Sequence, residues 1–306
     1  MRSRFRVPAS VLKFQRSTAF TIIEVLVATT VLSLMIVLIA QLFSSATSVI
    51  TLGNKRMETD VEARALLDRM AIDFGRMIQR ADVDYFVKSP TDAMTGDNDQ
   101  IAFYAEVPGY YPSSGSQSPV SLVAFRMNAS KLCLERLGKG LLWSGGATAS
   151  NTAMVFLPLT IKGEWPAATN QNSDSNYEVF SSQIFRFEYG YVVKGQTLPD
   201  GTMLPSIYST TPWDTRAGVA HTSIRGFQDV SAIVVSIAMI DSKSRVLVSD
   251  TSLSALAASM ADFDPSQYPN PGDLEKQWQS QIDSSRLPKS VTSGICIYRR
   301  TFSLTR

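Results

Sequence analysis

Oxygen ligands gather at one predicted turn. Asp92, Asp97, Asn98 and Asp99 lie within the segment TDAMTGDNDQ, and Ca²⁺ prefers carboxylate and amide oxygens of this kind. The residues lack EF-hand spacing, and Asp, Asn and Gly favour turns without any metal. We therefore expect no metal or other cofactor, with calcium at Asp92, Asp97 and Asp99 as the weaker alternative.

The chain has few residues for thiol or imidazole chemistry, with two cysteines and one histidine. His221 is the one histidine, and the sequence has no P-loop, G-x-S-x-G, H-E-x-x-H or CxxC motif. Cys133 and Cys296 could form one disulfide in an oxidising compartment or remain two separate thiols. We expect no catalytic residues and no enzymatic activity.

Positive charge is concentrated at the N-terminus. The first 19 residues contain five of the 29 basic residues and no acid, which leaves 24 basic against 27 acidic residues in the remainder, a net charge of −3. A remainder of this charge argues against nucleic-acid binding. The basic start suits a cytoplasmic tail before a membrane segment, by the positive-inside rule.

A long apolar run follows the basic start. No charged residue occurs from Val25 to Asn54, a span of 30 positions, and Val25 to Phe43 is the densest part. This exceeds the ~18 residues that indicate a transmembrane helix. A signal peptide cleaved near Ser44-Ser45-Ala46, or a plain signal anchor, would also explain the run.

Glu24 stands at the start of this run. The sequence Thr21-Ile22-Ile23-Glu24 has the form of a capping box, with Thr21 at the N-cap and Glu24 at N3. Such a carboxylate would satisfy the first turn and lie at the positive end of the helix dipole.

The segment AFTIIEVLVATTVLSL, residues 19–34, resembles the N-terminus of type IV prepilins and pseudopilins. The resemblance implies cleavage by prepilin peptidase between Ala19 and Phe20, and methylation of the new amino group. It also implies assembly roles for Thr21 and Glu24, whose carboxylate would offset the Phe20 amine of an adjacent subunit. The family usually has Gly where this chain has Ala19.

Two further segments carry looser resemblances. ARALLDRMAIDFGRMIQR (63–80) looks like J-type minor pseudopilins of type II secretion and W-type minor pilins, and the layout with GICIYRRTFSL (294–304) resembles a cassette-encoded prepilin-like protein of Verrucomicrobia. These resemblances imply a structural minor subunit of a type IV pilus or a protein-transporting pseudopilus. Its partners would be prepilin peptidase, other pilin-like subunits and inner-membrane lipid. The alternative is a membrane-anchored or secreted periplasmic binding domain or enzyme.

The expected organisation has four parts. They are a leader (1–19), a transmembrane helix (20–50), an amphipathic extension (51–84) and a β-rich head (85–306). The N-terminus would be cytoplasmic and the head periplasmic, and the assembled filament periplasmic or extracellular. The helix would end near Ala81, with Gly53 as a place where it could kink. Its apolar stripe comprises Leu67, Met70, Ala71, Phe74 and Ile78.

The head alternates short apolar runs with turn-rich segments, which predicts an α+β fold with an antiparallel sheet packed on the helix stripe. A hairpin is expected around 128–130, and 184–193 should place Phe185, Phe187, Tyr189 and Tyr191 on one face. Helices are expected at 252–263, capped by Thr251 or Ser252, and at 272–283. The expected strands are 100–107, 120–127, 131–138, 153–161, 184–193, 229–241, 244–250 and 294–304.

Overall fold

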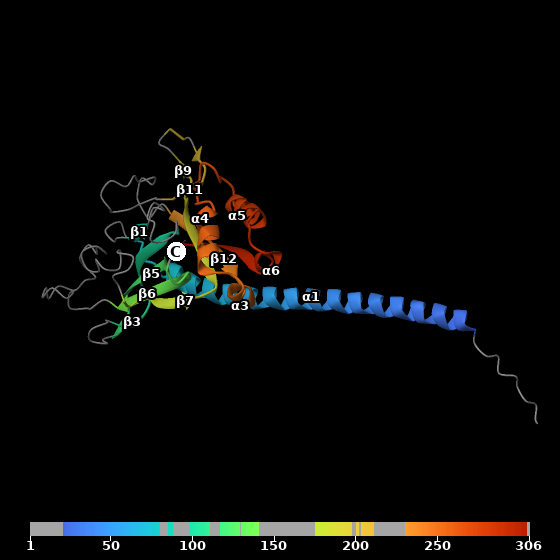
Figure 1. Ribbon diagram of the computed structural model, residues 1–306. Helices are drawn as coiled ribbons and strands as arrows, with labels where there is room; N and C mark the ends of the chain where they lie inside the picture. Colours follow the sequence, from blue (N-terminus) through green and yellow to red (C-terminus); the bar gives the residue numbers. More distant parts are fainter. Residues whose placement is uncertain are drawn as a thin grey trace, which may run out of the picture. The chain divides into compact units, whose positions relative to one another are not determined.

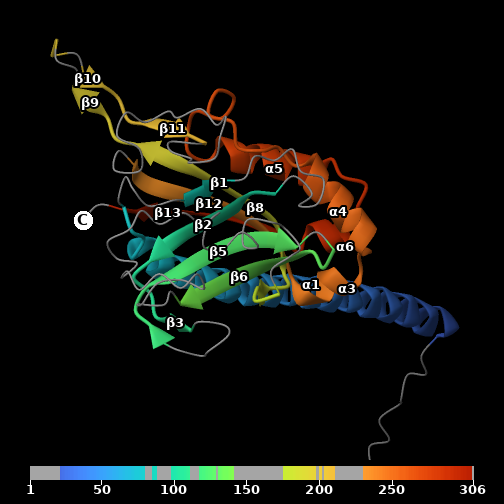
Figure 2. The ribbon, with the colours of Figure 1, turned by 90° about the vertical axis from the view of Figure 1, so that its left-hand side faces the viewer.

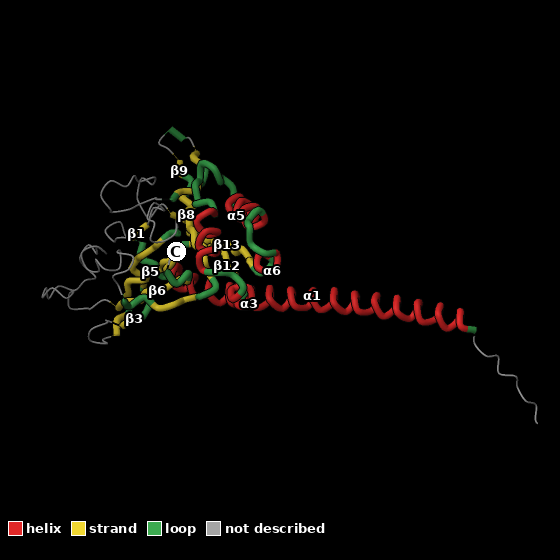
Figure 3. The backbone as a smooth tube through the Cα atoms, viewed as in Figure 1, coloured by secondary structure: helices red, strands yellow, loops and turns green. Residues whose placement is uncertain are grey.

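The computed structural model describes residues 21–79, 85–87, 98–110, 117–128, 130–140, 175–197, 200–201, 203–210 and 230–304. The chain forms two compact units, residues 1–51 and 52–306. Helix α1 (Ile22–Gly75) contributes residues to both (Figures 1 and 3). Gly53 lies inside α1 without interrupting it, and the helix ends six residues before the predicted Ala81.

The first sheet of the second unit has seven strands. β5 and β6 form the predicted antiparallel hairpin, with Asn128 opposite Cys133 (Figure 2). All its pairings are antiparallel except the parallel contact of Tyr110 with Lys139. The order is β1 (Tyr85–Val87), β2 (Gln100–Ala105), β5 (Ser121–Asn128), β6 (Cys133–Gly140), β3 (Gly109–Tyr110) and β4 (Gln117–Ser118), with β7 (Glu178–Ser181) also paired to β6.

A second sheet has four antiparallel strands. The predicted α+β fold with a long helix packed on sheet is confirmed, with two sheets where one was expected. Its order is β11 (Ile207–Ser209), β8 (Ile184–Val193), β12 (Val230–Ile240) and β13 (Ile295–Ser303). β12 is central and buried on both faces, as its continuous apolar run predicted. A short ribbon of β9 (Gln196–Thr197) and β10 (Met203–Leu204) lies between β8 and β12 in the sequence, as does β11, where no strand was predicted.

Helices cover one face of the four-stranded sheet. They are α3 (Ser242–Val246), α4 (Asp250–Ser259), α5 (Asp273–Asp283) and α6 (Lys289–Thr292). Leu253 and Leu256 of α4 and Trp278 of α5 pack with Ala238 and Ile295 of the sheet. The Trp278 indole N–H donates to the Ala261 carbonyl at 2.7 Å, which satisfies its polar atom in the core.

Residues 244–246 belong to α3 and Asp250 begins α4, so the predicted strand at 244–250 was wrong. The Asp241 carboxylate accepts hydrogen bonds from the N–H groups of Lys243 and Ser244, which starts α3. Both edges of β12 are already paired, by β8 and β13, so no edge is left for a further strand. Ser249, rather than Thr251 or Ser252, caps α4 by accepting from the Ser252 N–H.

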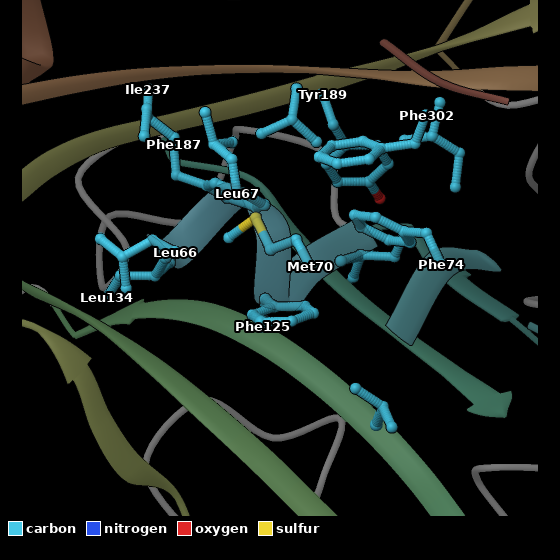
Figure 4. Packing of buried hydrophobic residues seen from close by; sticks show 14 of the residues in the cluster. Leu66, Leu67, Met70, Phe74, Phe125, Leu134, Phe187, Tyr189, Ile237 and Phe302 are labelled. Atoms are coloured by element: carbon cyan, nitrogen blue, oxygen red, sulfur yellow. The ribbon is translucent and has the colours of Figure 1, made fainter. Parts of the chain in front are cut away.

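The main core forms where residues 52–75 of α1 pack between the two sheets. Phe74 lies 5.2 Å, centroid to centroid, from Phe103 of the seven-stranded sheet and 5.1 Å from Phe302 of the four-stranded sheet. Figure 4 shows Met70 and Phe74 with Phe125 on one side and Phe302 on the other. The predicted stripe is therefore confirmed at Leu67, Met70, Ala71 and Phe74, which hold both sheets. Ile78 lies beyond the end of α1 and packs against a separate cluster that includes Tyr104 and Leu137, so its place in the stripe was wrong.

β8 departs from simple alternation at one residue. Its register against β12 shifts between Ala238 and Met239, so Phe185 is an extra residue in the ladder. Phe185 consequently packs in the cluster under α4 and α5, whereas Phe187 and Tyr189 pack in the core around α1. The prediction that all four aromatic residues share one face was wrong at Phe185. The predicted strand 153–161 lies outside the described residues.

The α1 stripe gives a direct stability test. Phe74→Ala should lower the free energy of unfolding by about 3–5 kcal/mol, because it removes a fully buried ring from between two sheets. Ile72→Ala, two residues away at 48% exposure, should change it by no more than about 0.5 kcal/mol. Denaturant unfolding of the full chain in detergent measures both. Equal effects would contradict the packing.

Candidate functional site

The start of α1 is the first candidate site. The Thr21 N–H and the Thr21 hydroxyl each donate to Glu24 Oε2 at 2.9 Å, and the Glu24 N–H donates to Thr21 Oγ1 at 3.3 Å. These reciprocal bonds are the predicted capping box. They order the first turn and fix the carboxylate at the positive end of the helix dipole.

The α1 surface behind this cap is apolar on every side. Residues 21–51 are all exposed, and the mean hydropathy of the most apolar window is 2.7. Length and composition make α1 the one helix in the described part of the chain that could cross a membrane. Apolar side chains exposed on all sides are costly in water and suit a hydrocarbon surrounding.

Several hydroxyl side chains of this segment are satisfied by the helix itself. The Thr29 hydroxyl donates to the Leu26 carbonyl at 3.0 Å, and the Ser33 hydroxyl donates to the Thr29 carbonyl at 2.7 Å. Thr30 bonds in the same way to the Val27 carbonyl at 2.8 Å. Hydroxyls bonded one turn back present little polarity outwards, so these residues do not prevent burial in lipid.

A buried ion pair attaches α1 to the seven-stranded sheet. Asp73 is fully buried, and Arg136 of β6 donates to both of its oxygens, at 2.8 and 3.0 Å. Arg69 lies 3.9 Å away, one turn back on α1. A two-point arginine–carboxylate pair fixes rotation and register as well as distance. The sequence showed Asp73 beside the stripe but not its partner, which lies 63 residues further along the chain.

Further polar contacts join α1 to the four-stranded sheet and α3. The Tyr298 hydroxyl donates to Asp60 at 2.6 Å, and burial together with this bond raises the pKa of Tyr298. Arg300 pairs with Asp68, and the Lys55 ammonium donates to Ser244 Oγ at 3.0 Å. These contacts are spread along α1 from Lys55 to Asp68, so they fix this part of the helix within the second unit.

A second candidate site is a buried cluster of charges on the helix-covered face of β8. Arg186 is fully buried, lies 3.2 Å from Glu188 and pairs with Asp262. Glu188 also accepts from the Phe263 N–H at 3.2 Å. Strand alternation places Arg186 and Glu188 on the face opposite Phe187, and the structure agrees. That face is covered by helices, so the two charged side chains are buried rather than exposed to water.

Asp99 joins this cluster from the edge of β8. Its Oδ2 accepts from the Tyr189 N–H at 3.0 Å, and Asn98 Oδ1 accepts from the Phe187 N–H at 2.7 Å. Asn98 and Asp99 thus complete the hydrogen bonds of β8 beyond the short strand β11. This is a structural role for two residues that the sequence offered as possible calcium ligands.

The cluster holds more acid than base, and its pKa values reflect this. Burial raises the pKa of Asp99 to about 7, against the opposing effects of the Tyr189 N–H and the Arg186 guanidinium. Burial, followed by the neighbouring Asp99 carboxyl, raises the pKa of Glu188 well above its ordinary value. With both pKa values raised, the two neighbouring carboxyls favour keeping a proton near neutral pH.

Nothing in the described part of the chain gathers three or more His, Cys, Asp or Glu side chains that could hold a metal ion. Asp92 and Asp97, the other calcium candidates, lie outside the described residues, as does His221. The pocket beside the cluster, lined in part by Tyr208, Phe263 and Glu275, has a volume of about 20 Å³. That is room for about one water molecule.

Cys133 and Cys296 are free thiols rather than a disulfide. Cys133 is buried in β6 of the seven-stranded sheet, and Cys296 is half-buried in β13 of the four-stranded sheet. Burial raises the pKa of both thiols, which favours the unreactive protonated form.

The charge cluster predicts a pH-dependent effect of Asp99→Asn. A carboxyl whose pKa is raised on folding keeps a proton that the unfolded chain releases, so its contribution to stability is lost as pH rises from about 4 to about 7. The stability of the variant relative to wild type should therefore rise steadily between pH 5 and pH 8. Denaturant unfolding of the full chain in detergent, across this pH range, measures the difference.

Asp283→Asn is the matched control, because Asp283 is exposed at the end of α5. Its stability difference from wild type should not change between pH 5 and pH 8. An Asp99→Asn difference that stays constant or falls with pH would contradict the assignment of raised pKa values to this cluster.

Comparison with known proteins gives a distant likeness in structure and no likeness to a family model. No protein-family model matches the chain, and no curated protein matches it. Among solved structures, the chain is similar to a type IV-like pilin from Thermus thermophilus, with 14% sequence identity. The match covers 80% of this chain and 94% of that chain at a TM-score of 0.28, a value that assigns no family.

Proposed function

We propose that this chain is a pilin-like structural subunit, anchored by a single membrane helix over residues 20–50 and assembled with other pilin-like subunits. Its head would lie on the periplasmic side, with the basic residues before Phe20 in the cytoplasm. Membrane helix packing and surface contacts of the head would be its function, without catalysis. Inner-membrane lipid would surround the helix before assembly.

One observation carries this proposal: a capped carboxylate stands at the head of a long apolar helix surface. The Thr21 and Glu24 cap is followed by residues exposed on every side and free of charge as far as Asn54. The same helix then becomes one-sided, with Met70 and Phe74 fully buried in the second unit. The first half of α1 is exposed and apolar, and the second half is built into the head. This arrangement suits a subunit that packs against other subunits through the exposed half of its helix.

The position of Glu24 also supports processing between Ala19 and Phe20. Cleavage there would make Phe20 the new N-terminus, with the cap beginning at the second mature residue and Glu24 as the fifth. The five basic residues before the cut would remain in the cytoplasm. Prepilin peptidase would be the processing partner and would also methylate the Phe20 amine.

Glu24 has an oxygen available for another subunit. Both Thr21 donors use Oε2, and no donor among the described residues contacts Oε1. We propose that Oε1 forms an ion pair with the charged amine of Phe20 in a neighbouring subunit. In a hydrocarbon surrounding, opposite charges attract strongly and an unpaired carboxylate costs several kcal/mol, so this pair would set the register of assembly.

The finer assignment is a minor subunit of a type IV pilus or a type II secretion-like pseudopilus. After processing, 287 of the 306 residues would remain, which is large for a major pilin. The segment 63–80, which looks like J-type and W-type minor subunits, includes the stripe that packs between the sheets.

Variants of Glu24 test the assembly role. Glu24→Ala should insert into the membrane but lose most of its incorporation into filaments or pilin-like complexes, because it removes the charge. Glu24→Gln should fail equally, since Gln can still accept the capping bonds but carries no charge. Membrane fractionation and co-purification with pilin-like subunits measure insertion and assembly separately.

Ser33→Ala is the matched control, because Ser33 lies exposed on the same helix and its hydroxyl bonds only one turn back. It should assemble normally. Wild-type assembly of Glu24→Gln, with only Glu24→Ala defective, would show that Glu24 acts as a cap and would contradict charge pairing.

A further inference from the structure

An exposed apolar pair forms the tip of α3. Val246 is 84% exposed and Leu247 is 62% exposed. Ser244 and Val248 on either side are buried, so the tip is held from both ends. The Ser244 hydroxyl donates to the Ser290 carbonyl of α6 at 3.2 Å, which fixes α3 against its neighbour. Two adjacent large apolar side chains are thus presented on a fixed turn.

Covalent connection places this tip close to the end of the proposed membrane segment. Lys55 lies 3.0 Å from Ser244 Oγ and 3.8 Å from Asp241, and Ser242 donates to Glu58 at 2.9 Å. Lys55 is the first charged residue after the run that ends at Asn54. Five residues of chain from residue 50 reach at most ~18 Å even when extended. The residues of α1 that hold α3 therefore begin within this chain length of residue 50.

The charges around the tip favour an anionic surface. Lys243 and Lys289 are exposed beside it, on α3 and on the adjoining α6. Arg245 pairs with Asp250, and Lys55 forms an ion pair with the buried Asp241. Positive groups exceed negative ones by one in this set: Lys55, Lys243, Arg245 and Lys289 against Glu58, Asp241 and Asp250. Basic residues next to a membrane segment are attracted to anionic lipids.

We propose that the α3 tip is a second membrane contact, in which Val246 and Leu247 enter the headgroup layer while Lys243 and Lys289 bind lipid phosphates. This inference rests on the proposed membrane anchor. An apolar pair flanked by lysines is the composition of an interfacial anchor. The contact would hold the head against the bilayer in the unassembled subunit, and entry into a filament would have to break it.

A protein partner fits this tip less well than lipid does. Stable protein interfaces bury about 800 Å² on each side, and two apolar side chains offer far less than that. The bilayer needs no complementary shape, and its position next to residue 50 follows from the chain itself. A second copy of the chain is therefore an outcome that the experiment must detect, not the expected occupant.

Photocrosslinking of the full chain in lipid nanodiscs tests the contact. A benzophenone side chain replaces Val246, Leu34 or Met203 in separate proteins; all three sites are exposed, and Met203 lies in β10, outside the elements that contact α3. With phosphatidylglycerol present, lipid adducts are expected at positions 246 and 34 and not at 203. Adding Lys243→Glu and Lys289→Glu should lower the adduct at 246 several-fold and leave that at 34 unchanged.

The outcomes separate the two proposals. A lipid adduct at 34 without one at 246 would overturn the α3 contact and leave the membrane anchor standing. A crosslink from 246 to a second copy of the chain would also overturn the lipid contact. Absence of lipid adducts at 34 would overturn the membrane anchor and the α3 contact with it.

Discussion

The structure depends on one helix that meets two different surroundings. Over residues 21–51 every side of α1 is exposed and apolar, whereas over 52–75 only the stripe that includes Met70 and Phe74 is buried. Phe74 touches aromatic rings of both sheets, so neither sheet could keep its core face without α1. The head is therefore organised around the same helix that carries the proposed membrane segment.

Polar contacts make this packing specific. Burial of apolar side chains favours compaction without choosing a rotation or a register. The Asp73–Arg136 pair and the Tyr298–Asp60 bond select one rotation and register, because their geometry is fixed. Asp73 is also a buried charge, which would be costly without Arg136. They lie on different sides of α1, one toward each sheet, so they orient both sheets on the helix.

Features that depend on neighbouring residues could be predicted from the sequence. The Thr21–Glu24 cap, the α1 stripe, the 128–133 hairpin and the central strand β12 each follow from local spacing, and the structure contains them. Features that depend on distant partners could not. Arg186 and Glu188 are buried because α4 and α5 cover them, and those helices occur more than 60 residues later.

The same reason explains the errors. The strands form two sheets rather than the one expected, because strand pairing depends on segments far apart in the chain. The predicted strand at 244–250 is absent because Asp241 caps α3 just before it and both edges of β12 are already paired. Asp99 likewise accepts a hydrogen bond from Tyr189, a residue 90 positions later, and local spacing gave no sign of this partner. The N-terminal pattern was more informative because its chemistry lies within five residues.

The mature N-terminus is the most direct test of the central claim. Protein isolated from its native membrane can be examined by mass spectrometry of the N-terminal peptide. We expect a peptide that begins at Phe20 and carries one methyl group on its amine. A peptide that begins at Met1 or at Thr47 would contradict it, because the first means an unprocessed anchor and the second a signal peptide removed after Ala46.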